Sequence, residues 1–347
     1  MELKHISYMQ HALSLAKKGL GSVSPNPMVG CVIVHHDQVV AEGYHQKYGE
    51  AHAEVNAINA LPENVDPSEC TVYVTLEPCS HFGKTPPCSD LIIKKGFKKV
   101  VVCNVDTNPL VGGKGIERLR NAGIEVITGV CEKEGRELNK RFFTLHEKKR
   151  PYIILKWAQT ADGFIARSNP VNPQDNWITG PEGKKLVHQM RSEEDAILVG
   201  KNTVLQDNPQ LTTRLVTGKN PLRIVISQSP ALPASLNVFN EEAPTILFNA
   251  EINETRGNVT FEKIDLNMPI IPQILEKLAK KGVSSLIVEG GTETLNSFIN
   301  AGYWDEMKVF VNPNLSFISG VLAPKTLLNT DFQMVGSDKL YTLYPKH

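Results

Sequence analysis

The side chains in this sequence best suited to chemistry are one histidine, one glutamate and two cysteines in its first third. His52 and Glu54 stand two residues apart at the start of a predicted helix, and Cys79 and Cys88 follow, each directly after a proline. A neutral imidazole and two thiolates can hold a zinc ion and leave its fourth position open for water, which is typical of catalytic rather than structural zinc. The sequence therefore predicts a catalytic zinc site formed by His52, Cys79 and Cys88.

Glu54 is predicted to move protons beside this metal. Because it lies two residues from a ligand, it need not bind zinc itself, and it can take a proton from zinc-bound water and pass it to a leaving amine. The order H-x-E followed by P-C is the signature of zinc-dependent deaminases. The cysteines are spaced Cys-x8-Cys rather than Cys-x2-Cys, and we expect the insertion to form a loop over the metal that contributes to substrate selection. The alternative is a helix-capping histidine beside two unrelated thiols.

The elements that would position these residues alternate between strands and helices. Short apolar runs predict strands over 29–34, 38–43, 71–76, 99–104 and 125–128, and helical periodicity predicts helices over 5–18, 52–60, 89–95, 114–122 and 132–146. This alternation predicts an α/β fold in which helices cover a mixed sheet.

The pattern breaks at a charged run that ends in Pro151 and then starts again. We therefore expect a first domain over 1–146, a linker over 147–151 and a second α/β domain over 152–347. In the second domain, strands are predicted over 152–157, 196–199, 222–227, 285–288 and 307–311, and helices over 181–190, 274–281 and 292–300.

Composition narrows the class of protein. A length of 347 residues favours about two domains. Lys and Arg total 37 and Asp and Glu total 37, so the net charge is zero, which argues against binding to nucleic acid or to an anionic membrane. The apolar runs are far shorter than the ~20 residues of a membrane span, and the N-terminus lacks the pattern of a signal peptide. Six cysteines are too few for a disulfide scaffold, so we expect a soluble cytoplasmic protein.

Several longer motifs run through both halves of the chain. They are Pro25-Asn26-Pro27-Met28-Val29-Gly30, EPCSHFGKTPPC over 77–88, Gly112-Gly113-Lys114-Gly115, Ala161-Asp162-Gly163, Trp177-Ile178-Thr179 and Val288-Glu289-Gly290-Gly291. Through these motifs the sequence, from about residue 5 to about residue 312, resembles the bifunctional deaminase-reductase family of riboflavin biosynthesis, in which the Cys-x8-Cys spacing is the norm. The resemblance implies an N-terminal cytidine-deaminase-like layered domain and a C-terminal dihydrofolate-reductase-like domain.

The same resemblance implies two consecutive reactions on a small-molecule pyrimidine ribotide. The first domain, with Zn²⁺, would remove the ring 2-amino group of a diaminopyrimidinone ribotide by hydrolysis. The second domain, with NADPH, would reduce the attached ribose to ribityl. The substrate contacts implied for the deaminase are Asn26, His45, His81, Lys84, Asp106 and Asn108.

For the reductase, the residues themselves offer one signal. No G-x-G-x-x-G motif is present, but Glu289 is followed by two glycines and a predicted helix, and a helix start of this kind can bind phosphate. An ordinary strand-to-helix turn is the alternative. The resemblance implies cofactor contacts at Ala158, Trp177, Thr203, Asp207, Gly291, Thr292, Glu293, Thr294, Leu295, Asn296 and Ser297. It implies ribotide contacts at Lys156, Asp175, Arg191, Leu211, Arg214 and Glu289.

Two departures from the family pattern keep other functions open. Asp175 stands where a small hydroxyl residue is common, and the segment after Pro313 departs from the family's pattern. One alternative is therefore a deaminase whose second domain is a scaffold that does not reduce. Another alternative is a zinc-dependent nucleic-acid-binding or tRNA-editing protein, which the zero net charge opposes. The resemblance also makes a homo-oligomer plausible.

Overall fold

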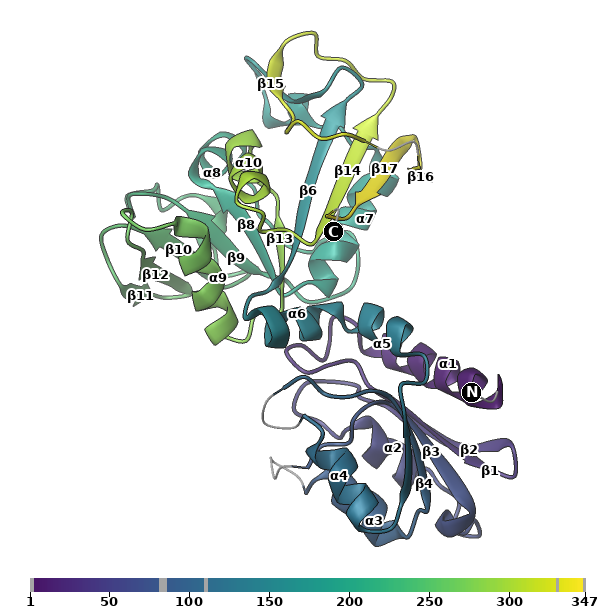
Figure 1. Ribbon diagram of the computed structural model, residues 1–347. Coiled ribbons are helices and arrows are strands. Elements are labelled where there is room, and N and C mark those ends of the chain that lie inside the picture. Colours follow the sequence, from purple (N-terminus) through teal and green to yellow (C-terminus); the bar gives the residue numbers. More distant parts are fainter. Residues whose placement is uncertain (1–2, 81–85, 109–111, 329–330, 346–347) are drawn as a thin grey trace. The chain divides into compact units, whose positions relative to one another are not determined.

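The structure is a computed structural model that describes residues 3–80, 86–108, 112–328 and 331–345. It divides into two compact units, residues 1–149 and 150–347, and their boundary lies in the charged segment that ends at Pro151. Each unit has its own sheet (Figure 1). Each also has its own hydrophobic core. Among the described residues, no helix is both long enough and apolar enough to span a membrane.

The first unit contains a five-stranded mixed sheet in the order β2-β1-β3-β4-β5. β1 pairs antiparallel with β2 and β3, whereas β3, β4 and β5 are parallel. The strands are β1 (Gly30–His35), β2 (Gln38–Tyr44), β3 (Cys70–Leu76), β4 (Lys99–Asn104) and β5 (Glu125–Thr128). The helices are α1 (Leu3–Ala16), α2 (Ala53–Asn59), α3 (Cys88–Lys95), α4 (Lys114–Asn121), α5 (Glu132–Leu138) and α6 (Lys140–Lys148), with the short 3-10 helices η1 (Lys17–Gly19) and η2 (Pro67–Glu69).

Helices cover both faces of this sheet. Along β1, side chains alternate between the faces, so that Ile33 packs in the cluster of α2, α3 and α4 while Val32 packs against α1. Because both faces are covered, β3 and β4 are buried along nearly their whole length. The result is a three-layer α/β/α unit, as the alternation of elements predicts.

One predicted helix is wrong. The sequence pattern predicts a single helix over 132–146, but α5 ends at Leu138 and α6 starts at Lys140 and continues to Lys148. The side chain of Asn139 accepts a hydrogen bond from Met28 N at 2.8 Å and donates one to Met28 O at 2.9 Å. This paired contact with a remote segment holds Asn139 at φ −102° and ψ 25°, outside the helical conformation, and divides the helix.

The second unit contains a ten-stranded sheet in the order β11-β12-β10-β9-β8-β13-β6-β14-β17-β16. The strands from β12 to β14 in that order are parallel, and β11, β17 and β16 add antiparallel edges. The strands are β6 (Tyr152–Thr160), β8 (Ala196–Gly200), β9 (Leu222–Ile226), β10 (Thr245–Asn249), β11 (Glu254–Arg256), β12 (Val259–Lys263), β13 (Ser285–Val288), β14 (Glu306–Asn312), β16 (Gln333–Val335) and β17 (Asp338–Leu343). A separate two-stranded sheet joins β7 (Phe164–Arg167) to β15 (Gly320–Leu322).

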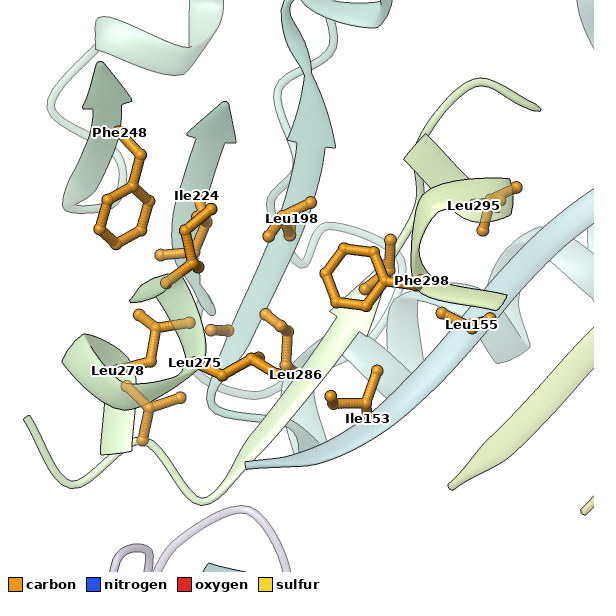
Figure 2. Close-up of a cluster of buried hydrophobic side chains, with 14 of the residues drawn as sticks. Ile153, Leu155, Leu198, Ile224, Phe248, Leu275, Leu278, Leu286, Leu295 and Phe298 are labelled. Carbon is orange, nitrogen blue, oxygen red and sulfur yellow. The ribbon is translucent and has the colours of Figure 1, made fainter. Parts of the chain in front are cut away.

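Helices also cover both faces of the larger sheet. They are α7 (Pro181–Glu193), α8 (Lys201–Asp207), α9 (Ile270–Lys280) and α10 (Thr292–Asn300), with the 3-10 helices η3 (Pro173–Asn176) and η4 (Asn237–Phe239). Figure 2 shows Leu275 and Leu278 of α9, together with Leu295 and Phe298 of α10, packed against strand residues. Met190 of α7 and Val204 of α8 belong to the cluster on the other face.

The sequence pattern missed several elements of this unit, namely α8, β7, β10–β12 and β15–β17. The segment after Asn312, which the sequence left without an assignment, pairs antiparallel with β14 through β17. Short, mostly exposed strands such as β16 carry little periodicity of their own, so only their partners in the sheet define them.

Asn139 provides a test of the division between α5 and α6. We expect Asn139→Ala to lower the free energy of unfolding by roughly 2 to 3 kcal/mol, because it leaves the buried N–H and C=O of Met28 without partners. Chemical denaturation of the full chain measures the change. The matched control is Asn121→Ala, an exposed asparagine at the end of α4, for which we expect a change of about 0.5 kcal/mol or less. Equal costs for the two variants would contradict this account.

Candidate active sites

The predicted zinc ligands come together from three elements of the first unit. His52 is the residue before α2, Cys79 follows β3, and Cys88 is the first residue of α3. His52 Nδ1 lies 3.7 Å from Cys79 Sγ and 3.3 Å from Cys88 Sγ, and the three ligand atoms all lie within 4.8 Å of one another. A tetrahedral zinc ion separates its nitrogen and sulfur ligands by about 3.6 Å. The residues present therefore fit this metal.

Hydrogen bonds and burial shift the pKa values of Cys79 and Glu54 in this site. The Cys88 side chain and the Cys88 N–H both donate to Cys79 Sγ and lower the pKa of the Cys79 thiol, which favours the thiolate that a metal needs. Glu54 is only 3% exposed. Burial, with a contribution from the charge of Cys79, raises the pKa of Glu54 to about 7. A carboxyl group with a pKa near neutrality can both accept and return a proton.

The side chain of Glu77, to which the sequence analysis assigned no role, holds the cysteine loop in place. One oxygen of its buried carboxylate accepts hydrogen bonds from the N–H groups of Gly115 and Ile116, and the other accepts from Asp106 and Gly113. These donors lie after β4 and at the start of α4, where backbone N–H groups otherwise lack partners. Glu77 therefore ties the segment that carries Cys79 to the neighbouring strand and helix.

Asn26 and His45, two predicted substrate contacts, lie beside the zinc ligands. His45 is buried, and its ring is 5.5 Å from that of His52 in an edge-on arrangement. Its Nδ1 is 3.0 Å from Ala51 O, so Nδ1 carries the hydrogen and Nε2 accepts from Asn26 Nδ2 at 3.2 Å. Burial lowers the pKa of His45, which keeps the ring neutral in this role.

The remaining predicted contacts of the deaminase belong to two loops. Asp106 Oδ1 accepts a hydrogen bond from Asn108 N at 2.7 Å, and Asp106 N donates to Glu77, so this turn is attached to the segment that carries Cys79. His81 and Lys84 lie outside the described residues.

In the second unit, a pocket of about 710 Å³ opens at the carboxyl ends of β8, β9 and β13. In sheets of parallel strands, ligands bind at this edge. Six of the predicted cofactor contacts line the pocket, namely Thr203, Gly291, Thr292, Glu293, Thr294 and Ser297. Gly200, Lys201, Ser227 and Gln228, which the sequence analysis missed, line it as well. Their position at the end of a strand or directly after one was the signal that could have found them.

The start of α10 suits a phosphate group. Gly291 is its N-cap and makes no side-chain capping hydrogen bond, so N–H groups of the first turn remain for a ligand. Gly291 N donates to Thr203 Oγ1 at 3.1 Å, which fixes the turn. A side chain on Gly290 would approach Thr294 Cβ to 2.6 Å, so only glycine permits this close packing. The residues present therefore fit the phosphates of a dinucleotide.

The other predicted cofactor contacts lie elsewhere in the second unit. Leu295 is fully buried in the cluster of Figure 2, so its side chain is a core residue and cannot line the pocket. Ala158 packs near Phe310, and Trp177 is 60% exposed with Lys184 Nζ 3.5 Å from its ring centre. Asp207 ends α8, Asn296 lies within α10, and neither is among the residues that line the pocket.

Three of the predicted ribotide contacts form a buried charged cluster. Arg191 donates to Glu289 Oε2 at 2.8 Å, and Lys156 Nζ lies 3.8 Å from Glu289 Oε1. Burial opposes ionisation of Glu289, but Arg191 and Lys156 lower its pKa, so it is a carboxylate. Within the part of the chain that the structure describes, Arg191 Nε and Glu289 Oε1 are buried without a hydrogen-bond partner. Such atoms are available to a ligand.

The other three predicted ribotide contacts differ from this cluster. Arg214 donates to Thr212 Oγ1 at 2.9 Å. The Leu211 side chain is buried in the core and is therefore not available to face a ligand. Asp175 Oδ2 accepts hydrogen bonds from Val171 N and Asn172 N, both at 2.9 Å, so its carboxylate stabilises its own loop.

The first site has the residues of a zinc-dependent deaminase, and the second unit joins to it a pocket that suits a dinucleotide. Residues 3–104 match the cytidine and deoxycytidylate deaminase zinc-binding region, and residues 151–325 match the RibD C-terminal domain. The chain belongs to the RibD family of riboflavin biosynthesis.

Relatives and solved structures agree over nearly the whole length. The chain is 48% identical to riboflavin biosynthesis protein RibD of Aquifex aeolicus, over 89% of this chain and 87% of that one. It is 41% identical to RibD of Bacillus amyloliquefaciens, over 94% and 88% of the two chains. The crystal structure of a diaminohydroxyphosphoribosylaminopyrimidine deaminase/5-amino-6-(5-phosphoribosylamino)uracil reductase from Thermotoga maritima has a TM-score of 0.88 and 38% identity and covers 99% of each chain.

The chain is therefore a bifunctional enzyme of riboflavin biosynthesis, with a zinc-dependent deaminase and an NADPH-dependent reductase. The expected α/β fold is confirmed, with a cytidine-deaminase-like first domain and a second domain that matches the RibD C-terminal domain. A deaminase with a non-reducing scaffold is not favoured, since the reductase domain matches over 151–325.

Glu77 offers a test of how the zinc site is held. We expect Glu77→Gln to lower the free energy of unfolding by roughly 2 to 4 kcal/mol, because its amide group places N–H donors against backbone N–H donors. Zinc content after dialysis against a chelator should fall as well, since the loop that carries Cys79 is released. Glu117→Gln is the matched control, because Glu117 is an exposed acidic residue in the first turn of the same helix. Full zinc retention by Glu77→Gln would refute this role.

Proposed function

We propose that the first unit hydrolyses the ring 2-amino group of a diaminopyrimidinone ribotide and that the second reduces the ribose of the product to ribityl. Support comes from the two activities named for the Thermotoga maritima protein, which is similar over 99% of this chain. The observation that carries the deaminase half is the cluster of His52, Cys79 and Cys88 beside the buried Glu54.

In the deaminase, the chain would hold zinc through His52, Cys79 and Cys88. When bound, the zinc ion supplies a water activated for attack at neutral pH. Glu54 acts as the proton carrier: it accepts a proton from the attacking water and delivers it to the ring nitrogen. It then accepts the proton of the hydroxyl group newly bonded to the ring carbon and delivers it to the amino group, which leaves as ammonia when the carbon–nitrogen bond breaks. Its burial and its pKa of about 7 support both directions of transfer.

Asn26 recognises the pyrimidine edge in this proposal. Its amide can donate and accept, which matches a ring that presents both kinds of group. Because Asn26 Nδ2 donates to His45 Nε2, the amide is held in one orientation. Asp106 and Asn108 lie on the loop tied to Glu77, and we propose that they contact the substrate, as we also propose for His81 and Lys84.

In the reductase, NADPH supplies the hydride, and the start of α10 with Thr203 binds its phosphates. Ala158, Trp177 and Asp207 are proposed as further cofactor contacts. Lys156 polarises the C1 group of the open-chain sugar, and Glu289 keeps Lys156 and Arg191 in position. Arg191 and Arg214 offer bidentate donors to the ribotide phosphate.

We also propose that the protein works in the cytoplasm as a homo-oligomer without nucleic-acid or membrane partners. Two thiolate ligands favour a reducing compartment. The resemblance to the family is the support for self-association, which light scattering tests.

The order of the two reactions gives the main test. With the diaminopyrimidinone ribotide, wild-type protein should release ammonia and oxidise a matching amount of NADPH. Glu54→Gln should retain zinc, and its rate of ammonia release should fall about 100-fold or more, because the glutamine amide cannot carry protons. The variant should still oxidise NADPH when given the deaminated aminouracil ribotide, which controls for folding. Ammonia release near the wild-type rate would rule out Glu54 as the proton carrier.

The glycine turn before α10 gives a separate test of the reductase. We expect Gly290→Ala to raise the KM for NADPH about tenfold, the equivalent of ~1.4 kcal/mol, because the new Cβ displaces Thr294 and the start of the helix. Ammonia release in the same sample is the internal control and should not change. An unchanged KM for NADPH would place the cofactor phosphates elsewhere.

A further inference from the structure

A second group of metal-ligating side chains lies in the first unit, outside the active site. His35 ends β1, His36 begins the turn to β2, and Glu69 ends η2 directly before β3. Glu69 Oε2 is 3.0 Å from His35 Nε2 and 3.8 Å from His36 Nε2. The zinc ligand Cys79 follows the carboxyl end of β3, whereas Glu69 precedes its amino end, so the two groups lie at opposite ends of that strand.

Backbone contacts hold these three residues in position without any metal. His35 pairs with Cys70 across β1 and β3, which places the neighbouring Glu69 beside it. His36 and Asp37 have φ angles of 47° and 61°, as in the two-residue turns that join antiparallel strands. Tyr8 Oη donates to Asp37 O at 2.8 Å and anchors the turn to α1. The backbone of the segments that carry the three ligands is therefore well defined.

The donor set has a defined metal preference. Two imidazoles and one carboxylate suit borderline divalent cations such as Zn²⁺, Ni²⁺ and Cu²⁺ rather than Mg²⁺ or Ca²⁺. The His36 side chain is 76% exposed, so water can fill the remaining coordination positions. An ordinary ion pair needs only one histidine. His11 and Glu42 form such a pair, with His11 Nε2 2.8 Å from Glu42 Oε2. Here a second ring lies 4.0 Å from the first, centre to centre, and faces the same carboxylate.

We propose that His35, His36 and Glu69 form a second divalent-cation site, distinct from the catalytic zinc site. Bound metal links the β1–β2 turn to the segment before β3. It therefore stabilises the first unit without taking part in deamination.

Metal stoichiometry tests this proposal. Full-length protein is first loaded with zinc and then dialysed to equilibrium against Ni²⁺, and both metals are measured. We expect one zinc and one nickel per chain in the wild type, and zinc alone in His36→Asn and Glu69→Gln. Asparagine is chosen because it tolerates the positive φ of position 36. Deamination should be unchanged in both variants.

His11→Ala is the matched control, because it removes an exposed histidine that pairs with a single carboxylate. It should keep the nickel. Absence of nickel in the wild type, or equal loss in His11→Ala and His36→Asn, overturns the proposal. Cobalt in place of nickel gives a second readout. Cobalt bound at His35, His36 and Glu69 should show no thiolate-to-metal absorbance, because that absorbance arises only at the cysteine site.

A different observation, in the second unit, concerns His188 of α7. Its side chain is buried, and its Nδ1 accepts a hydrogen bond from Arg214 N at 2.9 Å. Burial is the main cause that lowers the pKa of His188 to about 4. The positive charges of Arg191, Arg214 and Lys156 lower it further, whereas the negative charge of Glu289 raises it. His188 is thus a neutral acceptor among charged groups.

The hydrogen bond fixes the loop that carries a proposed phosphate contact. Arg214 also donates through its guanidinium to Thr212 Oγ1 at 2.9 Å, and Leu211 has a left-handed φ of 57°. Arg214 is therefore held at two points, through its backbone N–H and through its guanidinium group. We infer that His188 is a positioning residue for ribotide binding in the reductase, an inference that rests on the proposed function.

Steady-state kinetics with the deaminated ribotide separate this role from a general loss of stability. His188→Phe should raise the KM for the ribotide about tenfold with little change in kcat or in the KM for NADPH, since it removes the acceptor of the Arg214 backbone N–H. His188→Asn supplies an acceptor oxygen and should restore most of the affinity. Equal KM values in His188→Phe and the wild type overturn the inference. Failure of the wild type itself to oxidise NADPH would instead refute the proposed function.

Discussion

The first unit depends on one buried carboxylate. Glu77 stands between the end of β3 and the zinc ligand Cys79, and it accepts four backbone hydrogen bonds from the turn after β4 and the start of α4. Hydrogen bonds to a charged group are stronger than neutral ones, and N–H groups at a helix start attract negative charge. A single side chain thus orders the chain segment that must present a thiolate to the metal.

Both active sites use the same property of parallel strands. Cys79 follows β3, and the cofactor pocket opens after β8, β9 and β13. Parallel strands end at one edge of the sheet, so loops remote in sequence meet there and leave backbone groups available to ligands. In each unit the helix that starts at this edge, α3 or α10, brings its N-terminus to the site.

The two sites handle buried charge differently. In the deaminase, burial raises the pKa of Glu54 to about 7 although the nearby His52 acts in the opposite direction, and a pKa near neutrality suits a group that must gain and lose a proton. In the reductase, Glu289 lies between Arg191 and Lys156, and its pKa falls, which suits a fixed anion that orients two cations. The same residue type therefore serves as a proton carrier in one unit and as an organiser in the other.

The sequence by itself determined the features that are local. The zinc site could be identified because its residue types stand at recognisable places in the sequence, beside prolines and at predicted helix starts; these residues are His52, Glu54, Cys79 and Cys88. The alternation of predicted strands and helices likewise indicated two α/β units. Tertiary structure alone decided the role of Glu77, the break at Asn139, the buried position of Leu295 and the pairing of β17 with β14. Each of these depends on a contact with a segment remote in sequence, and periodicity reports only the environment of a residue along its own element.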